Sequence, residues 1–391
     1  MVNLLNAHMN NVRTWIEIDK KALRHNVGGF FDIISADTRL MAVIKSNAYG
    51  HGLVAAAEEI ARVPRFAERG WFGVDSIVEA LRLRREGIAS PILVLGFTLP
   101  SRMLDAARED IRISISNFDA LESLGMLAQR PAIHLKFDTG MHRQGFLQKD
   151  ITRLISILKK KKIQPEGVFT HFASAKDAAY PTYTLAQLAE FKENIMRLEQ
   201  AGFSPLVRHA AATGGALLFP HAHLDMVRIG MGLYGYWPSE EAKSEKRKPQ
   251  HKEQEMQIKL KPVLSWKTVI AEVKKIPKGS FVGYDLTERT HRTTTIAVLP
   301  IGYWHGYDRG FSSQGKVLVE GARASVLGRV SMDMVVIDVT DIPSARVGSE
   351  AVLIGAQGKE MIDAEEFGRM IGTSSYEVLT RINPLIKRIV V

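Results

Sequence analysis

The fold of this chain is constrained most by an alternation of short apolar runs and amphipathic segments between residues 40 and 235. The apolar runs are Leu40–Ile44, Trp71–Val74, Ile92–Leu95, Ile111–Ile115, Ala132–Phe137, Gly167–Thr170, Leu206–His209 and Met226–Ile229. The amphipathic segments include Ser76–Arg85, Phe118–Ala128, Ile151–Lys160 and Thr184–Ala201. Such alternation predicts parallel βαβ units of the α/β class, and eight units close a (β/α)8 TIM-like barrel. An open doubly wound sheet is the alternative that the pattern allows.

The sequence changes character after Tyr236. Residues 239–257 are highly charged and carry almost nothing apolar, which predicts an exposed linker or loop. The rest is punctuated by Gly and Pro, and its short β-type runs are Val269–Val273, Thr293–Leu299, Lys316–Val319, Ala324–Leu327, Met334–Val339 and Glu350–Ile354. We therefore expect a barrel over residues 20–238 and a mainly β C-terminal domain over residues 258–391, with a strand at 12–18 added to it.

The composition narrows the functional classes. The chain has no cysteine, which excludes disulfides, thiolate catalysis and cysteine-based metal sites. Residues 1–14 lack the apolar stretch of an export signal, and no apolar run approaches the ~20 residues of a membrane span. We expect a soluble, cytoplasmic protein with no metal site and no membrane partner.

The formal net charge of +10 is compatible with nucleic-acid binding, because clustered Lys and Arg neutralise phosphates. However, the basic residues are scattered along the chain. The one tight run, Lys159–Lys162, ends an amphipathic segment, where cations favour a helix C-terminus. We interpret the run as a solvated helix end and expect no nucleic-acid partner.

Lys45 is the first candidate for chemistry, because barrel enzymes build their sites where strands end. It follows the first apolar run directly, and partial burial would lower its pKa from ~10.4 toward a nucleophilic range. A lysine that extends from the strand to water is the plain alternative. The segment Lys45–Gly52 resembles the site that attaches pyridoxal phosphate (PLP) in the alanine racemase family, and it departs from that site only at Ser46. The resemblance extends from about Thr14 to the last helix.

The resemblance implies an enzyme that interconverts L- and D-alanine, supplying D-alanine for peptidoglycan, with PLP on Lys45. The other cofactor-binding residues that it implies are Tyr49, His171, Thr213, Arg228, Gly230, Met231 and Tyr376. From the residues alone, a histidine beside apolar neighbours, as His171 is, can also be a satisfied core residue. Its place at a strand end favours a functional role.

The segment Lys136–Gly145 resembles the family's substrate-side loop. The resemblance implies that Arg143 contacts the substrate carboxylate and a cofactor oxygen, and an arginine fork suits a carboxylate. Lys136 matches a family lysine that is often carbamylated and orients this arginine. An ordinary ion pair with a neighbouring carboxylate is the alternative for Lys136.

The resemblance places Arg228 against the pyridine nitrogen of PLP. Arginine carries donors only, so that nitrogen would stay unprotonated and the ring would be a weaker electron sink. A PLP decarboxylase usually places an acid there, so Arg228 favours racemisation.

Racemisation requires an acid–base group on each face of the α-carbon. By resemblance, Lys45 serves the D-face, and Tyr284 from the second domain reaches the partner subunit's barrel to serve the L-face. A half-buried hairpin tyrosine is the alternative for Tyr284. The resemblance thus implies a homodimer with composite sites. It also implies that Met332, Asp333 and Tyr303 bind the substrate.

The sequence departs from the family pattern at several positions. Ser331 replaces a common cysteine, Ala212 replaces a frequent asparagine, Trp304-His305 replaces Ala-Asp, and Asp285-Leu286 follows Tyr284 where glycine is common. These changes leave the substrate range open, so a racemase of another small amino acid such as serine is an alternative. A decarboxylase and a PLP carrier without turnover are further alternatives, and the latter would not need the second domain.

Overall fold

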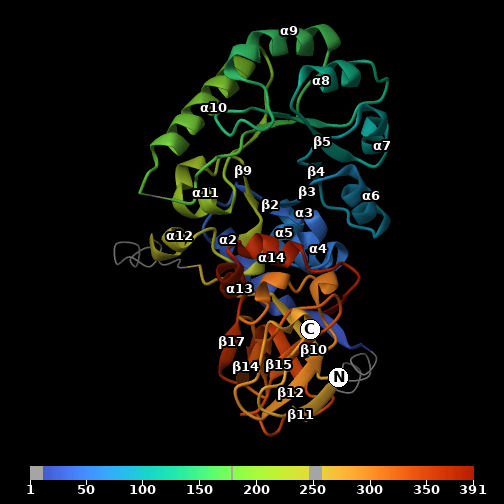
Figure 1. Cartoon of the computed structure of the whole chain (residues 1–391). Helices are drawn as coiled ribbons and strands as arrows, with labels where there is room; N and C mark the ends of the chain where they lie inside the picture. The colour runs from blue at the N-terminus through green and yellow to red at the C-terminus, as the bar shows by residue number, and fades with distance from the viewer. Residues whose placement is uncertain (1–11, 178, 246–257) are drawn as a thin grey trace. The chain divides into compact units, whose positions relative to one another are not determined.

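The computed structural model describes residues 12–177, 179–245 and 258–391 (Figure 1). The chain divides into two compact units. We call residues 21–48 and 53–261 the barrel unit, and residues 12–20, 49–52 and 262–391 the β unit.

The barrel unit is built on eight parallel strands. They are β2 (Arg39–Val43), β3 (Gly70–Val74), β4 (Ile92–Val94), β5 (Ile111–Ile115), β6 (Ile133–Lys136), β7 (Gly167–Phe169), β8 (Val207–His209) and β9 (Met226–Ile229). Their spatial order is β8-β7-β6-β5-β4-β3-β2-β9. The two ends of this order meet, because Asp225 N–H donates to Arg208 C=O (3.1 Å) and Arg228 N–H to Ala211 C=O (2.9 Å). The predicted barrel is confirmed, and the open sheet is excluded.

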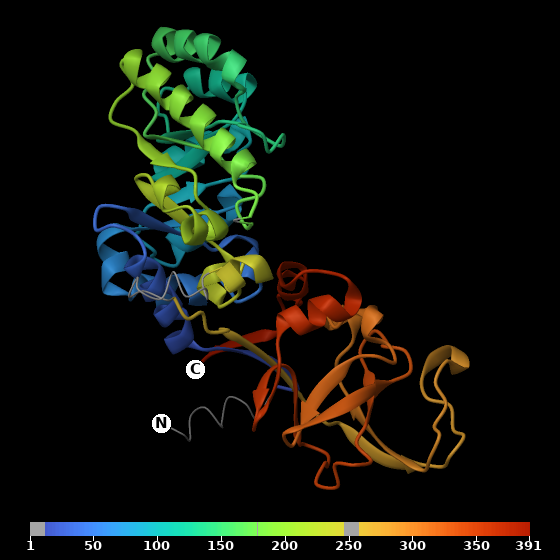
Figure 2. The same ribbon diagram turned by 90° about the vertical axis from the view of Figure 1, so that its left-hand side faces the viewer.

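Helices surround these strands, and both views show α9 and α10 outside the barrel (Figure 1, Figure 2). The helices of the barrel unit are α2 (Lys20–Asp32), α3 (Lys45–Tyr49), α4 (Leu53–Ala61), α5 (Pro64–Arg69), α6 (Ile77–Arg85), α7 (Met103–Arg108), α8 (Phe118–Gly125), α9 (Ile151–Lys161), α10 (Thr182–Gln200), α11 (Thr213–Leu218) and α12 (Glu240–Glu245). Local sequence explains their ends. Ser76 and Glu79 form a capping box on α6, and Asn117 caps α8. The lysine run does end α9, as predicted.

The β unit is one mixed sheet, in the order β11-β12-β15-β14-β13-β16-β10-β1-β18 with β17 beside β16. Its strands are β1 (Thr14–Ile18), β10 (Leu264–Val269), β11 (Glu272–Ile276), β12 (Thr294–Leu299), β13 (Lys316–Val319), β14 (Ala322–Leu327), β15 (Val335–Asp338), β16 (Glu350–Gln357), β17 (Glu360–Ile362) and β18 (Lys387–Val390). Strand β1 runs antiparallel to β10 and parallel to β18. Two helices, α13 (Ala364–Ile371) and α14 (Ser375–Thr380), complete the unit.

The predicted run Val269–Val273 is wrong, because it spans the break between β10 and β11. Ile270 N–H donates to Ser349 C=O next to β16, whereas Ala271 N–H donates to Val298 C=O in β12. The chain therefore changes pairing partner in the middle of a run that is continuous in hydropathy. The predicted linker 239–257 contains the short helix α12, and its residues 246–257 lie outside the described part.

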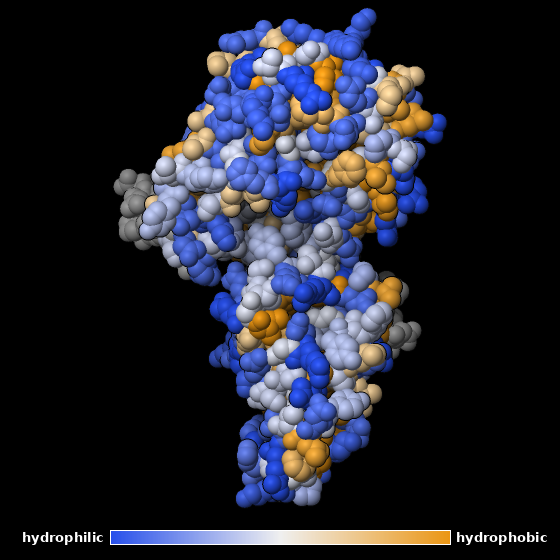
Figure 3. All heavy atoms as spheres, turned by 45° about the horizontal axis from the view of Figure 1, so that its top comes forward, coloured by the Kyte–Doolittle hydropathy of each residue, from blue (hydrophilic) through white to orange (hydrophobic). Residues whose placement is uncertain are grey.

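Surface hydrophobic side chains lie in separate patches among hydrophilic ones on the face shown in Figure 3. No helix in the described part of the chain is both long enough and apolar enough to span a bilayer.

Candidate active site

The short segment after β2 has an unusual backbone. Ser46, Asn47 and Ala48, which follow Lys45, take φ values of 54°, 56° and 54° with ψ between 44° and 52°. This is a left-handed helical turn, and it costs about 1–2 kcal/mol for each residue other than glycine. The side chain of Asn47 offsets part of that cost by accepting the N–H of Leu53 at 2.9 Å. A strained turn persists only where surrounding contacts hold it, so these contacts fix the backbone directly after Lys45.

Lys45 is half-buried, with 38% of its side chain exposed. Its Nζ lies 3.4 Å from a carboxylate oxygen of Asp75, which follows β3. The ammonium at this strand end therefore has a partner in the neighbouring loop.

Arg228 on β9 is buried and contacts residues at the ends of two other strands, β7 and β8. Its Nη2 donates to the carbonyls of Thr170 (2.7 Å) and Ala210 (2.9 Å) and lies 3.3 Å from Nδ1 of His171. Its Nη1 lies 2.9 Å from Nδ1 of His209. Burial lowers the pKa of Arg228 to about 9, so the guanidinium remains charged at neutral pH. The side chain is a buried cation held by neutral acceptors.

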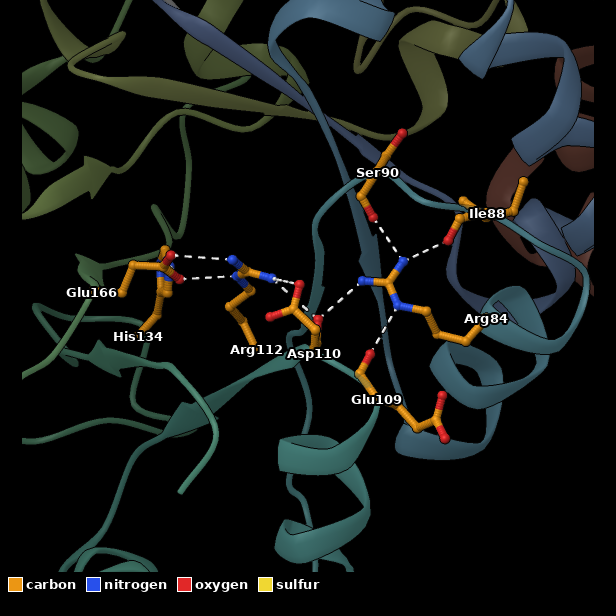
Figure 4. A network of polar contacts seen from close by, with 8 residues as sticks. All are labelled: Arg84, Ile88, Ser90, Glu109, Asp110, Arg112, His134 and Glu166. Carbon is orange, nitrogen blue, oxygen red and sulfur yellow. Dashed lines mark hydrogen bonds and ion pairs between the residues drawn. The ribbon is translucent and has the colours of Figure 1, made fainter. Parts of the chain in front are cut away.

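Two buried histidines, which the sequence analysis missed, extend this contact through the barrel. Nε2 of His209 lies 2.8 Å from Nδ1 of His134, and Nε2 of His134 faces Glu166 at 3.4 Å. Glu166 in turn pairs with Arg112 at 3.1 Å, and Figure 4 shows this outer end. Because Arg228 can only donate, Nδ1 of His209 must accept, so His209 carries its proton on Nε2 and donates it to His134.

This chain of contacts holds neutral imidazoles beside Arg228. Burial lowers the pKa of His209 and of His134, and the charge of Arg228 adds to both effects. Burial, reinforced by Arg228, also lowers the pKa of His171 to about 3. The only sequence signal for His134 and His209 was a histidine within an apolar strand, which does not show that the two rings meet.

These three histidines predict an acid-sensitive fold. A buried neutral histidine with a lowered pKa binds a proton only after unfolding, so stability is kept above pH ~6.5 and falls as the pH drops below it. We expect a loss of up to about 1.4 kcal/mol per pH unit for each histidine between pH 6.5 and pH 5, measured by denaturant unfolding. The exposed His221 is the control, since His221→Gln should leave the slope unchanged. A free energy of unfolding that is flat over this window would contradict the assignment.

The loop after β6 presents Arg143. The carboxylate of Asp138 accepts the N–H groups of His142 (2.9 Å), Gly140 (3.1 Å) and Arg143 (3.0 Å). Burial alone would raise the pKa of Asp138, but these three bonds outweigh it and lower the pKa. Asp138 therefore stays charged and fixes the loop, a role that the sequence analysis did not assign.

Lys136 lies at the end of β6 and is buried. Its Nζ donates to Oε1 of Gln144 at 3.2 Å. Burial, with the charges of Arg143 and Arg228, lowers the pKa of Lys136 to about 8. Within the described residues no ion pair joins Lys136 to a carboxylate, so the plain alternative from the sequence is wrong. The loop after β6 and the residues that follow β7 line a small pocket. Its lining residues are Lys136, Phe137, Met141, Arg143, Gln144 and His171.

Thr213, Gly230 and Met231 also lie together. Thr213 begins α11, and its hydroxyl accepts the N–H of Gly230 at 3.1 Å. Met231 begins the short 3₁₀ helix Met231–Tyr234. A hydroxyl and the first N–H groups of two helical segments form a set of donors for an anion.

Two family models match the chain. The alanine racemase N-terminal domain matches residues 18–238, and the alanine racemase C-terminal domain matches residues 263–390. The chain belongs to the alanine racemase family.

Individual alanine racemases resemble the chain along nearly all of its length. The alanine racemase of Leptospira interrogans serovar Lai is 39% identical over 380 residues, which cover 97% of this chain and 96% of that protein. That of Symbiobacterium thermophilum is 38% identical over 380 residues and covers 96% of each. Family membership confirms the resemblance that the motifs suggested, and it assigns the chain to the isomerases.

Solved alanine racemases share the fold. The structure from Clostridium difficile 630 has a TM-score of 0.88 at 30% identity and covers 97% of this chain and 96% of that one. The Bacillus anthracis structure, which has L-Ala-P bound, has a TM-score of 0.87 at 33% identity, covering 97% and 95%.

The remaining predicted site residues of this alanine racemase family member lie in the β unit. Tyr284 begins a 3₁₀ turn after Gly283 (φ 77°) and is 68% exposed. Asp285 and Leu286, which depart from the family pattern, both take positive φ, and Arg329 pairs with Asp285 at 2.9 Å. Tyr284 thus lies in the connection of a short irregular hairpin, which includes the antiparallel bridge between Phe281 and Arg289, but it is exposed and not half-buried.

The structure brings Tyr303 close to Met332. Tyr303 N–H donates to Ser331 C=O (3.1 Å), and Trp304 N–H donates to Met332 C=O (3.1 Å). A side chain at Gly302 would collide with Ser331 C=O, so only glycine permits this approach. Asp333 lies in the same turn, 4.0 Å from His305.

Two departures have a structural explanation here. The Ser331 hydroxyl donates to Met334 C=O (2.7 Å) and accepts its N–H (3.0 Å), which closes the turn without a cysteine. His305 accepts the N–H of Gly302 through Nδ1 at 3.2 Å. Ala212 precedes α11 without a side-chain cap, and nothing in the structure explains this choice.

Tyr49 and Tyr376 both belong to the β unit. Their rings pack edge to face, with centroids 6.1 Å apart.

Proposed function

We propose that this protein interconverts L- and D-alanine with PLP bound through Lys45. The observation that carries the proposal is Arg228, a buried donor held by carbonyls and neutral imidazoles at the strand ends. The residues present fit the cofactor: a lysine for its aldehyde, a donor for its ring nitrogen, and Thr213 with the Gly230–Met231 backbone for its phosphate. When bound, PLP supplies an electron sink for the α-carbon.

Each residue of the chain then has a defined task. Lys45 holds or returns the α-proton on the D-face, and Tyr284 from the partner subunit does so on the L-face. Arg143, held by Asp138, orients the substrate carboxylate. Arg228 offers only donors, so it would leave the ring nitrogen of bound PLP unprotonated and would favour direct return of the proton over decarboxylation.

We also propose a homodimer. Its support is the exposure of Tyr284 (68%), Met332 (54%) and Tyr303 (44%) in the β unit, since a partner's barrel would cover such side chains. Asp333 would join Met332 and Tyr303 at the substrate, and Tyr376 and Tyr49 would bind the cofactor.

The deciding experiment measures D-alanine formation from L-alanine by the purified protein with added PLP. D-Alanine that appears only when Lys45 is intact would establish reaction and cofactor together. A panel including L-serine, compared by kcat/KM, tests the substrate range. Carbon dioxide release in place of D-alanine would identify a decarboxylase, and visible absorbance of bound PLP without any turnover would identify a carrier.

We further propose that Lys136 is carbamylated. A pKa of about 8 leaves more neutral amine at neutral pH than an ordinary lysine has, and the neutral amine is the form that reacts with carbon dioxide. The product would be an anion between two cations, Arg143 and Arg228.

This modification predicts a dependence on bicarbonate. Removing dissolved carbon dioxide should lower kcat/KM by about tenfold, which is the size of effect expected when a group that orients a functional residue is lost. Added bicarbonate should restore kcat/KM. Lys136→Met should be slow in both buffers. A ¹³C-bicarbonate carbamate signal in the NMR spectrum, absent from Lys136→Met, would be the direct observation. Identical rates in both buffers would refute the modification.

A further inference from the structure

Glu79 joins the loops that follow two neighbouring barrel strands. One of its carboxylate oxygens, Oε1, accepts the N–H of Ser46 at 2.7 Å and the N–H of Asn47 at 3.4 Å. The other, Oε2, accepts the N–H of Asp75 at 2.9 Å and the N–H of Ser76 at 3.3 Å. Both oxygens of this single side chain are thus bonded to main chain, each in a different loop.

The left-handed turn explains why an anion is needed there. Consecutive residues with helical dihedrals of one hand turn their N–H groups to the same side, and such a set attracts negative charge. Ser46 and Asn47 present this set immediately after Lys45. The strands are already in register, because Ile44 N–H donates to Gly73 C=O at 2.8 Å. Beyond the strand ends, Glu79 keeps the two loops at a fixed distance from each other, next to the reactive side chain of Lys45.

The position of Glu79 on α6 gives it a second, separable role. It is the third residue of that helix, and its own N–H donates to the Ser76 hydroxyl at 3.3 Å in the capping box. The capping bond stabilises the helix alone. The bonds from Oε1 to Ser46 and Asn47 have no part in capping, so the two roles can be tested apart.

We propose that Glu79 is the residue that positions Lys45 for proton transfer. It holds the left-handed turn at a fixed distance from the Asp75 loop, and so it sets where Nζ stands when it exchanges a proton with the substrate. The inference rests on the proposed function, because it concerns the D-face step assigned to Lys45. A shift of ~1 Å in a reacting group can cost on the order of 10²-fold in rate.

The test compares three variants of the PLP-loaded enzyme. Glu79→Ala removes both sets of bonds, and Glu79→Gln keeps an acceptor for only one loop. Ser76→Ala, the matched control, removes the hydroxyl of the capping box and leaves the bonds to Ser46 and Asn47 in place. For each, release of α-deuterium to water is measured separately from D-alanine and from L-alanine, together with the visible absorbance of bound PLP and the melting temperature.

A positioning role predicts a directional defect. Glu79→Ala should retain PLP but release deuterium from D-alanine at least tenfold more slowly than the wild type, with a smaller loss from L-alanine. Glu79→Gln should lie between the two, and Ser76→Ala should stay within about twofold in both directions although its helix cap is weakened. If Glu79→Ala does not fold, Glu79→Gln is judged by the same directional criterion.

Two results would overturn the inference. One is equal slowing of both enantiomers in the Glu79 variants, and the other is a Ser76→Ala enzyme with the same defect. Neither would affect the proposed function, which stands or falls on wild-type racemisation and on the loss of activity in Lys45→Ala.

Discussion

Replacement of Lys45 by alanine is expected to abolish racemisation and to remove the visible absorbance of bound PLP. Lys45 combines two tasks at the end of β2, the covalent hold on the cofactor and proton transfer on the D-face. General acid–base catalysis alone contributes about 10²–10⁴-fold, so kcat should fall by at least about 10³-fold. The measurement is D-alanine formation, with an absorbance spectrum of the same sample.

The control for this variant is Lys160→Ala. Lys160 lies in the last turn of α9, where its loss removes a solvated charge without touching the strand ends. It should keep both the spectrum and the rate. A Lys45→Ala protein with the wild-type spectrum would show that the cofactor is attached elsewhere.

Replacement of Tyr284 by phenylalanine is expected to slow proton exchange from L-alanine far more than from D-alanine. The substitution removes only a hydroxyl, and Tyr284 is 68% exposed on a turn, so folding should be little affected. Loss of one acid–base group should cost about 10²–10⁴-fold on the L-face. Deuterium release from each enantiomer measures the two faces separately.

The two-base proposal makes this asymmetry the opposite of the one expected for Glu79→Ala. Tyr180→Phe is the matched control, because Tyr180 is also exposed (79%) but lies in the barrel unit outside the site residues. If Tyr284→Phe slowed both enantiomers alike, a single group would serve both faces. Mixing Lys45→Ala with Tyr284→Phe then tests the dimer, since composite sites predict a rate of racemisation above that of either variant alone.

Most of the barrel could be predicted because each of its strands leaves a local pattern in the sequence. A strand buried on both faces reads as a continuous apolar run, and each of the eight predicted runs contains or overlaps an observed strand. The β unit was less predictable. Strand β10 alternates buried and half-buried residues but runs into the apolar pair Ile270-Ala271, and only the pairing of β10 with β16 and of β11 with β12 separates the two strands.

The sequence by itself determined the family and the candidate residues, because Lys45–Gly52 and Lys136–Gly145 are contiguous and carry their chemistry in residue type. Tertiary structure alone decided the partners of those residues. Arg228, His209 and His134 lie on three different strands, and their protonation follows from contacts across the barrel.

The left-handed turn after Lys45 likewise has no local signal that names Glu79, which lies 33 residues further along the chain from Ser46. Residue type sets which chemistry is available. Burial and distance, which only the folded chain creates, set which groups are charged, which are neutral and where each one stands.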